Sequence, residues 1–401
     1  MKTLMMDSAE LTDNKRRVIT LLKKHGLLSK GHLAVQGGMG WATAVKVISQ
    51  LADAGIVERL GTIREDNGKK GKRAYLYGLT PVNPLAVGID VEYRTTSMVL
   101  TNLKGETLDR YVIPTVNPTS DRDILRFLFK IVRNFLKQNP ARTEAVRGVG
   151  IGIPGIGFPS NRRLDNIIKM RDLEIRLSNK LEIPVRVSDN TKAYTVFEQW
   201  SNQTFPLEDF IFISIRTGVG SGIYNQGNLY LGNHGLSGEI GHIPVVLDGT
   251  LCRCGNRGCM ETIVGQRSLF REYSSRVLGN SENPEDPEPE VIQEGLADLF
   301  TRARRGEIVP MEIIGTAAGQ LGRCLAMAIM VLDITNIVIS GHFGPDGNVL
   351  IGPLESSIRS NLLPGSVFSV KYLPFDPDGH VQGAALLVLK DYFIDMRKFQ
   401  L

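Results

Sequence analysis

The sequence predicts an α/β protein in which a small helical head precedes a larger body of alternating strands and helices. The head is unusually basic. Residues 1–80 carry 14 Lys or Arg against 7 Asp or Glu, whereas the remaining residues of this +5 chain are close to neutral. From residue 85 onward, strand-like and helix-like segments alternate to the end of the 401 residues. A basic head on a near-neutral body predicts a polyanionic partner for the head.

The head reads as a helix-turn-helix. A helix is predicted over 13–25, capped by Asp13 or Asn14, and Ser29 is placed to cap a short helix that ends near Val35. A glycine-rich turn then leads into a helix from Trp41 to Ala54, which in this geometry enters the major groove of DNA. Four residues lie away from its apolar side and are predicted to contact DNA: Trp41, Thr43, Lys46 and Ser49.

A hairpin follows these helices. Two strand-like segments at 56–65 and 74–80 flank the charged turn DNGKKGKR, and a helix-turn-helix followed by a hairpin is a winged helix. Alone, such a lysine run is more often a solvated hairpin tip, but the preceding helices favour phosphate contacts. The residues predicted to make them are Lys69, Lys70, Lys72 and Arg73.

The body alternates between strands and helices. We expect a three-stranded meander over 85–115, and the acidic segment 280–290 reads as a surface loop. No tandem repeat of 20–50 residues is present. The other predicted segments are helix 120–138, strand 146–154, strand 185–190, helix 191–200, one strand over 210–232, helix 310–332, strand 336–341 and helix 381–393.

A metal site is predicted in the stretch 236–265. It carries one histidine and three of the four cysteines: His242, Cys252, Cys254 and Cys259. One imidazole and three thiolates complete a tetrahedral set for Zn²⁺, so one structural zinc per chain is expected. The alternative, a disulfide with a spare thiol, is disfavoured because Cys-x-Cys is too short for an easy bridge. Gly255 and Gly258 let the loop turn tightly enough for two of the thiols to meet.

Five motifs together resemble a known family. They are EIGH (239–242), CRCGNRGCME (252–261), GIGIPG (150–155), TGVGSGI (217–223) and NIVISG (336–341). The chain is similar to the ROK family of repressors, open-reading-frame proteins and sugar kinases. The resemblance implies a two-lobed, actin-like ATPase (sugar kinase) fold behind the winged helix, as in the family's transcriptional regulators. The implied domains are head 1–80, linker 81–86, first lobe 87–195 plus 381–401, and second lobe 196–380.

The resemblance also implies a sugar site beside the zinc loop. The family's motifs assign sugar contacts to Glu239, His242 and Glu261, and fixed carboxylates suit vicinal hydroxyls. Asn166, in LDNIIKMRD (164–172), is the counterpart of a sugar-binding asparagine. Lys169 or Arg171 would admit an anionic ligand, so the effector is a monosaccharide or a sugar phosphate. Asp189 and Asn190 complete the implied sugar-binding set.

Catalysis is expected to be lost. Family kinases have a catalytic aspartate before the helix at 191–200. Here Asn190 occupies that position, unless the alignment with the family is shifted by one residue, which would place Asp189 there. The first phosphate loop is DVEYRTT (90–96), in which Glu92 and Tyr93 replace glycines and a carboxylate repels phosphate. The second loop, TGVGSG, is intact.

The expected function is a cytoplasmic, sugar-responsive transcriptional regulator, most simply a repressor of carbohydrate genes. A homodimer or homotetramer would bind palindromic double-stranded operator DNA. No signal peptide and no apolar run long enough for a membrane span are seen in the sequence. Two alternatives stay open. One is an active ATP-dependent sugar kinase with a DNA-binding head, and the other is a regulator switched by a protein partner.

Overall fold

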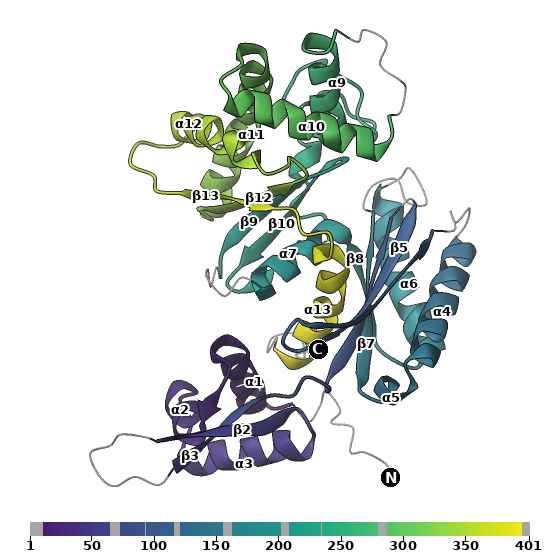
Figure 1. The fold of residues 1–401 in the computed structure, drawn as a ribbon, viewed down its shortest axis with the longest axis vertical. Helices are drawn as coiled ribbons and strands as arrows, with labels where there is room; N and C mark the ends of the chain where they lie inside the picture. The colour runs from purple at the N-terminus through teal and green to yellow at the C-terminus, as the bar shows by residue number, and fades with distance from the viewer. Residues whose placement is uncertain are drawn as a thin grey trace. The chain divides into compact units, whose positions relative to one another are not determined.

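The computed structural model describes residues 11–64, 73–92, 94–115, 121–154, 163–201, 208–233, 235–279 and 287–394, with the side chains of Arg64, Asp121 and 163–169 excepted. The chain forms two compact units (Figure 1). The first comprises Met1–Pro154, Ile168–Thr204 and His380–Leu401, and the second comprises Gly155–Ile167 and Phe205–Gly379. The head clusters with the first unit. The finer division into head, linker and two lobes stays a prediction.

The predicted winged helix-turn-helix is present in the described part of the head. Its elements are α1 (Asp13–His25), β1 (Leu28–Ser29), α2 (Lys30–Gln36), α3 (Trp41–Asp53), β2 (Val57–Arg64) and β3 (Arg73–Leu79). The three strands pair in the order β1-β3-β2. The Ser29 hydroxyl accepts a hydrogen bond from the backbone N–H of His32, as the cap prediction requires. The cap prediction for α1 is wrong, because Asp13 is already the first residue of the helix and the N-cap is Thr12, with no side-chain cap bond.

The first unit contains a five-stranded sheet of order β6-β5-β4-β7-β8. The strands β4, β5 and β6 form the predicted antiparallel meander, and β4, β7 and β8 are parallel. Every residue of β4 is buried, which fits its apolar sequence LAVGIDV. The elements are β4 (Leu85–Val91), β5 (Thr95–Asn102), β6 (Thr107–Pro114), α4 (Asp121–Gln138), α5 (Pro140–Thr143), β7 (Val146–Ile153), α6 (Arg163–Leu181), β8 (Val185–Asp189), α7 (Asn190–Ser201) and α13 (Gly379–Phe393).

The second unit repeats this sheet, with order β11-β10-β9-β12-β13. Again an antiparallel hairpin precedes parallel pairs, so the two units share one strand order and one pattern of directions. The elements are β9 (Phe210–Ile215), β10 (Val219–Asn225), β11 (Asn228–Leu229), η2 (Ile240–His242), α8 (Glu261–Val264), α9 (Gln266–Arg276), α10 (Pro289–Arg304), α11 (Ile308–Leu332), β12 (Asn336–Gly341), η3 (Gly347–Leu350), α12 (Ile351–Asn361) and β13 (Ser369–Pro374). This duplication confirms the two-lobed fold that the family resemblance implies, although the sequence shows no repeat.

Several elements differ from those predicted. The segment 210–232 is not one strand, because Thr217 and Gly218 turn the chain into the β9–β10 hairpin and a second turn leads to β11. Helices α6, α9, α10 and α12 and strand β13 were not predicted from the sequence. Most of the acidic segment 280–290 lies outside the described residues, and its last two residues already belong to α10.

Helix α11 is the longest element of the second unit. Its length of 25 residues and its hydropathy would allow a membrane span, which the sequence analysis did not anticipate. In the structure, its buried face, including Leu321 and Leu325, packs in the same apolar cluster as Ile211 and Ile213 of β9. A buried core helix accounts for this apolar composition.

Candidate functional site

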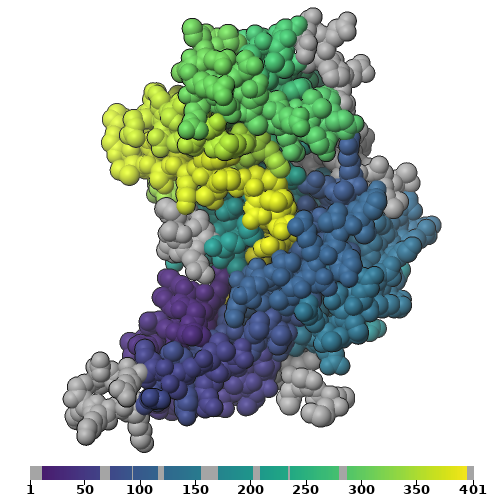
Figure 2. Space-filling view, in the orientation of Figure 1, coloured from purple at the N-terminus to yellow at the C-terminus, as the bar shows by residue number. Residues whose placement is uncertain are grey.

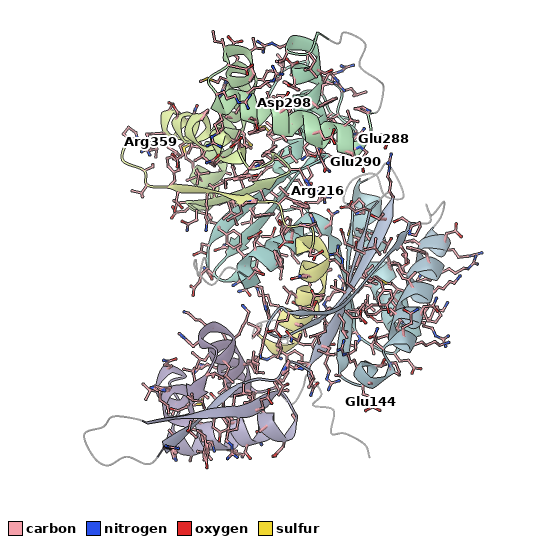
Figure 3. All side chains as sticks on the ribbon, in the orientation of Figure 1. Glu144, Arg216, Glu288, Glu290, Asp298 and Arg359 are labelled. Atoms are coloured by element: carbon pink, nitrogen blue, oxygen red, sulfur yellow. The ribbon has the colours of Figure 1, made fainter. Side chains whose placement is uncertain are left out.

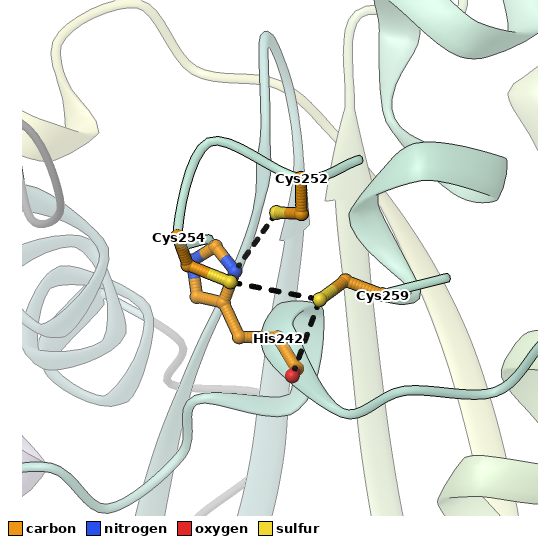
Figure 4. Close-up of side chains that lie close together, drawn as sticks. All are labelled: His242, Cys252, Cys254 and Cys259. Atoms are coloured by element: carbon orange, nitrogen blue, oxygen red, sulfur yellow. Dashed lines mark hydrogen bonds between the residues drawn. The ribbon is translucent and has the colours of Figure 1, made fainter. Parts of the chain in front are cut away.

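Four potential metal ligands converge in the second unit. His242 ends η2, and Cys252, Cys254 and Cys259 belong to the loop that follows (Figure 4). Their ligand atoms all lie within 4.8 Å of one another. The Cys254 and Cys259 Sγ atoms are 3.6 Å apart, and Cys252 Sγ lies 3.5 Å from His242 Nδ1. These spacings fit a tetrahedral ion with Zn–S and Zn–N bonds of about 2.3 and 2.0 Å, whose ligand atoms are roughly 3.5–3.8 Å apart.

The environment of the buried thiols raises their pKa. Burial and the neighbouring thiols raise the pKa of Cys259 to about 12. Burial likewise raises the pKa of Cys252. Without metal these two thiols are therefore protonated at neutral pH, and a metal ion that binds them would displace their protons. The fourth cysteine, Cys324, is buried on α11 and is not part of the cluster.

The backbone of the loop is shaped by two glycines. Gly255 has φ +92° and Gly258 has φ +66°, conformations that side chains rarely adopt. A Cβ at Gly258 would also lie 1.8 Å from the carbonyl oxygen of Val246. The sequence prediction that these glycines shape the loop is confirmed.

Glu261 joins the metal cluster to the glycine-rich loop. Its carboxylate accepts a hydrogen bond from the backbone N–H of Val219 at 3.2 Å and forms an ion pair with Arg253 at 3.0 Å. Its other oxygen lies 3.9 Å from Cys252 Sγ. A Cβ at Gly218 would meet this carboxylate at 2.2 Å, so the loop glycine makes room for Glu261. Arg253 was not among the site residues predicted from the sequence.

The other residues of the implied sugar site are distributed over both units. Glu239 is half-buried directly before η2, and its carbonyl accepts the N–H of His242. His242 faces the thiols through Nδ1, which lies 3.5 Å from Cys252 Sγ. Asp189 and Asn190 belong to the first unit, and the side chain of Asn166 lies outside the described residues. Their role in sugar binding stays a prediction.

Asp189 already has two partners. Its carboxylate caps α7 by accepting the backbone N–H of Lys192 at 2.9 Å, and it pairs with the Lys192 ammonium at 2.5 Å. The Lys192 side chain is 4% exposed, so this pair is largely desolvated. A carboxylate held in this way is poorly placed to accept a proton from a sugar hydroxyl.

The predicted DNA-binding residues of α3 lie on one side of the head. Ala44, Val47, Ile48 and Leu51 are buried, whereas Trp41, Lys46 and Ser49 are exposed and Thr43 is half-buried. Trp41 is 61% exposed, so its indole is accessible to a partner. Arg73 is exposed at the start of β3, and Lys69, Lys70 and Lys72 lie outside the described residues.

The head contacts the rest of the first unit through more than the linker. Lys23 on α1 donates to the carbonyl oxygen of Trp200 at 3.1 Å and lies 4.2 Å from the Trp200 ring. Burial lowers the pKa of Lys23 to about 8, with a smaller contribution from Lys390. Arg16 donates to the carbonyl oxygen of Tyr392 at 2.6 Å. Helices α7 and α13 therefore both end against α1.

A further cluster gathers at the carboxyl ends of β9, β12 and β13. The His342 ring lies 3.8 Å from the Phe375 ring, and the Arg216 guanidinium lies 4.9 Å from the same ring. Burial and Arg216 lower the pKa of His342 to about 4, so this imidazole is neutral. The three residues directly follow parallel strands, and that position is the signal by which the sequence could have indicated them.

Comparison with known proteins places the chain among regulators and kinases of one family. The xylose repressor of Bacillus subtilis is 26% identical over 394 residues, covering 96% of both chains. The Escherichia coli DNA-binding transcriptional dual regulator NagC is 23% identical over 356 residues, covering 87% of this chain and 85% of its own. A glucokinase of Halalkalibacterium halodurans is 26% identical over 286 residues, covering 69% and 86%.

The fold and the family agree with these relatives. The crystal structure of a ROK family transcriptional regulator, a homologue of the E. coli MLC protein, superposes with a TM-score of 0.75 and 22% identity, covering 96% of this chain and 98% of its own. The ROK family model matches residues 86–391. The chain therefore belongs to the ROK family.

Proposed function

We propose that the protein is a sugar-responsive, DNA-binding transcriptional regulator, most simply a repressor of carbohydrate-utilisation genes. The observation that carries this proposal is the winged helix in front of a ROK body, with relatives named as repressors over nearly the whole chain. The exposed α3 residues would read the major groove, and the basic hairpin tip would contact phosphates.

The metal of the His–Cys₃ cluster is proposed to be zinc, in a structural role. All four positions of the tetrahedron are taken by protein ligands, so none is left for a reacting water. In this proposal Glu239, Glu261 and the Nε2 of His242 bind sugar hydroxyls, and Arg253 orients Glu261. Zinc would then hold the ligand-binding loop in place.

Helix α7 offers a route from the sugar site to the head. It begins at Asn190, in the proposed sugar-binding set, and its Trp200 contacts Lys23 of the head. The linker adds a second connection, because Asn83 donates to the carbonyl oxygen of Ala54 and accepts from Arg147. A ligand that binds one arrangement of the unit more tightly would reposition the head through these contacts.

The proposal is tested by operator selection followed by titration. Duplexes that the protein binds would be recovered from a random-sequence pool, and the affinity for them would be measured with and without monosaccharides and their phosphates. At least one such ligand is expected to change operator affinity about fivefold or more, since allosteric couplings are typically about 1–3 kcal/mol. The absence of any ligand effect in the whole panel would contradict sugar control while leaving DNA binding intact.

A sugar kinase is the second candidate, supported by the fold and by the glucokinase relative. Against it, Asp189 is engaged with Lys192, and the Val219 N–H of the second phosphate loop is engaged with Glu261. We expect no ATP-dependent sugar phosphorylation in a coupled assay. Asp189→Ala should instead lower the free energy of unfolding by about 2–4 kcal/mol, because it removes the carboxylate that pairs with the buried Lys192 ammonium and caps α7, whereas Asn190→Ala should not. Turnover that disappears in Asp189→Ala would establish the kinase.

A cytoplasmic homodimer or homotetramer fits this proposal. Two heads related by a two-fold axis would match a palindromic operator, with half-sites about one helical turn or a multiple apart. Switching by a protein partner remains compatible with the same head and body, and a sugar-insensitive protein would favour it.

A further inference from the structure

Helix α4 in the first unit exposes five basic residues, and its other exposed residues, Asn134 and Gln138, are neutral. Its apolar residues, including Ile124, Leu128 and Phe135, are buried against the sheet. Five exposed cations follow the opposite face at helical spacing: Arg122, Arg126, Lys130, Arg133 and Lys137. We call these five residues the α4 stripe. At 1.5 Å per residue it is about 22 Å long, with roughly 6 Å between residues four apart.

The α4 stripe differs from the charged face of helix α10. On α10, Asp298 (labelled in Figure 3) pairs with Arg302 one turn later, which is the usual pattern of a solvated helix face. In the part of the chain that the structure describes, no carboxylate pairs with any member of the α4 stripe. The two acidic residues of α4, Asp121 and Asp123, lie in its first turn, where the helix dipole favours them.

Neighbouring residues extend the positive surface. Lys180, exposed on α6, lies 4.5 Å from the ring of Phe129, and Arg133 lies 5.5 Å from the same ring. The Phe129 ring therefore contacts one cation from each of two helices, Arg133 of α4 and Lys180 of α6. In Figure 2, residues of this part of the sequence, coloured blue, form part of the surface on the side facing the viewer.

We propose that the α4 stripe is a second DNA-binding surface, which contacts the phosphates of duplex that continues beyond the part bound by the winged helix. This inference rests on the proposed function, because it takes DNA as the partner of the chain. A row of like charges without partners destabilises itself unless a polyanion neutralises it. Duplex DNA carries one charge per about 1.7 Å, so a 22 Å length offers roughly thirteen phosphates. The contact would strengthen binding without reading sequence.

The test compares DNA affinity on two duplex lengths at several salt concentrations. The variant Arg122→Gln/Arg126→Gln/Lys130→Gln removes three charges from the α4 stripe and leaves the ring contacts of Arg133 in place. The short duplex, of about 12 base pairs, accommodates one recognition helix, and the long one has about 50. Each lost phosphate contact lowers the slope of log affinity against log salt by about 0.9, so the variant's slope on the long duplex should fall by about 2–3. On the short duplex both proteins should bind equally.

A matched variant controls for net charge. Arg271→Gln/Arg305→Gln/Arg323→Gln removes three exposed charges from the second unit and should leave both slopes unchanged. Retained zinc content and an unchanged melting temperature would show that both variants fold, and the single variant Lys130→Gln should lower the slope by about 0.9.

Three results would overturn the inference. The first is an unchanged slope on the long duplex in the triple variant, and the second is an equal loss in the matched variant. The third is unchanged DNA binding together with variant-sensitive binding of polyglutamate, which would assign the α4 stripe to an acidic polypeptide. Wild-type protein that binds neither duplex would contradict the proposed function itself.

Discussion

Cys259→Ser is expected to release the metal and to abolish both the folding of the loop and the response to sugar. The serine hydroxyl does not ionise at neutral pH and is a poor zinc ligand, so the tetrahedral set loses one of its four members. Structural zinc contributes on the order of 10 kcal/mol in small domains, whereas an average point mutation costs about 1 kcal/mol. Cys254→Ser should behave in the same way, since its Sγ lies 3.6 Å from that of Cys259.

Metal content by mass spectrometry and thermal melting measure this effect. One zinc per chain is expected in the wild-type protein and in Cys324→Ser, which changes the same atom outside the cluster. Metal affinity should also fall as the pH is lowered, because protons compete with the ion for the thiolates. If Cys259→Ser retains zinc and binds sugar normally, the four residues do not form the site that the geometry indicates.

Much of this site could be predicted because its chemistry lies within a short stretch of sequence. Three cysteines and a histidine within 18 residues identify a metal cluster without any knowledge of the fold. Two contacts of Glu261 could not be predicted in the same way: its ion pair with Arg253 and the hydrogen bond that it accepts from the Val219 N–H. The Val219 contact depends on how β10 packs against the metal loop, and sequence spacing does not give that distance. The pairing of Asp189 with Lys192 is local, at a separation of three residues, but the burial of Lys192 depends on distant packing.

The fold shows the same division between local and distant information. Helices α1 and α3 have strong apolar periodicity and caps or turns near their ends, and they were predicted within one residue. Helix α6 was missed, and its amphipathic pattern is weak. Strand β13, an edge strand with partly exposed residues, was missed because its polar sequence SVKYLP lacks the apolar run of a central strand. The two sheets share one topology in their backbone pairing but not in their sequences, so no sequence repeat predicts the duplication.

Gly150→Ala is expected to be the most destabilising small substitution in the first unit, by about 4 kcal/mol or more. Gly150 lies on β7 within the GIGIPG motif, where a phosphate-binding role is the usual expectation for glycines. In the structure, the lack of a side chain at Gly150 allows helix α13 to pack closely against β7. A Cβ there would lie 1.7 Å from the carbonyl oxygen of Ala384 on α13, and Gly88 on β4 would place one 2.1 Å from the carbonyl oxygen of Val381. Backbone cannot move aside as a flexible side chain can, so α13 would have to leave the sheet.

A matched control variant is expected to change the free energy of unfolding in the opposite direction. Gly319→Ala, inside α11 with nothing within 4 Å of the added Cβ, should raise the free energy of unfolding by about 0.5–1 kcal/mol because alanine favours the helix. Chemical denaturation of the two variants measures both effects. Since α13 ends at Phe393 and Arg16 of the head bonds to the carbonyl oxygen of Tyr392, Gly150→Ala should also weaken operator binding. Equal midpoints for the two variants would contradict the close contact of α13 with β7, and with it the route by which this helix supports the head.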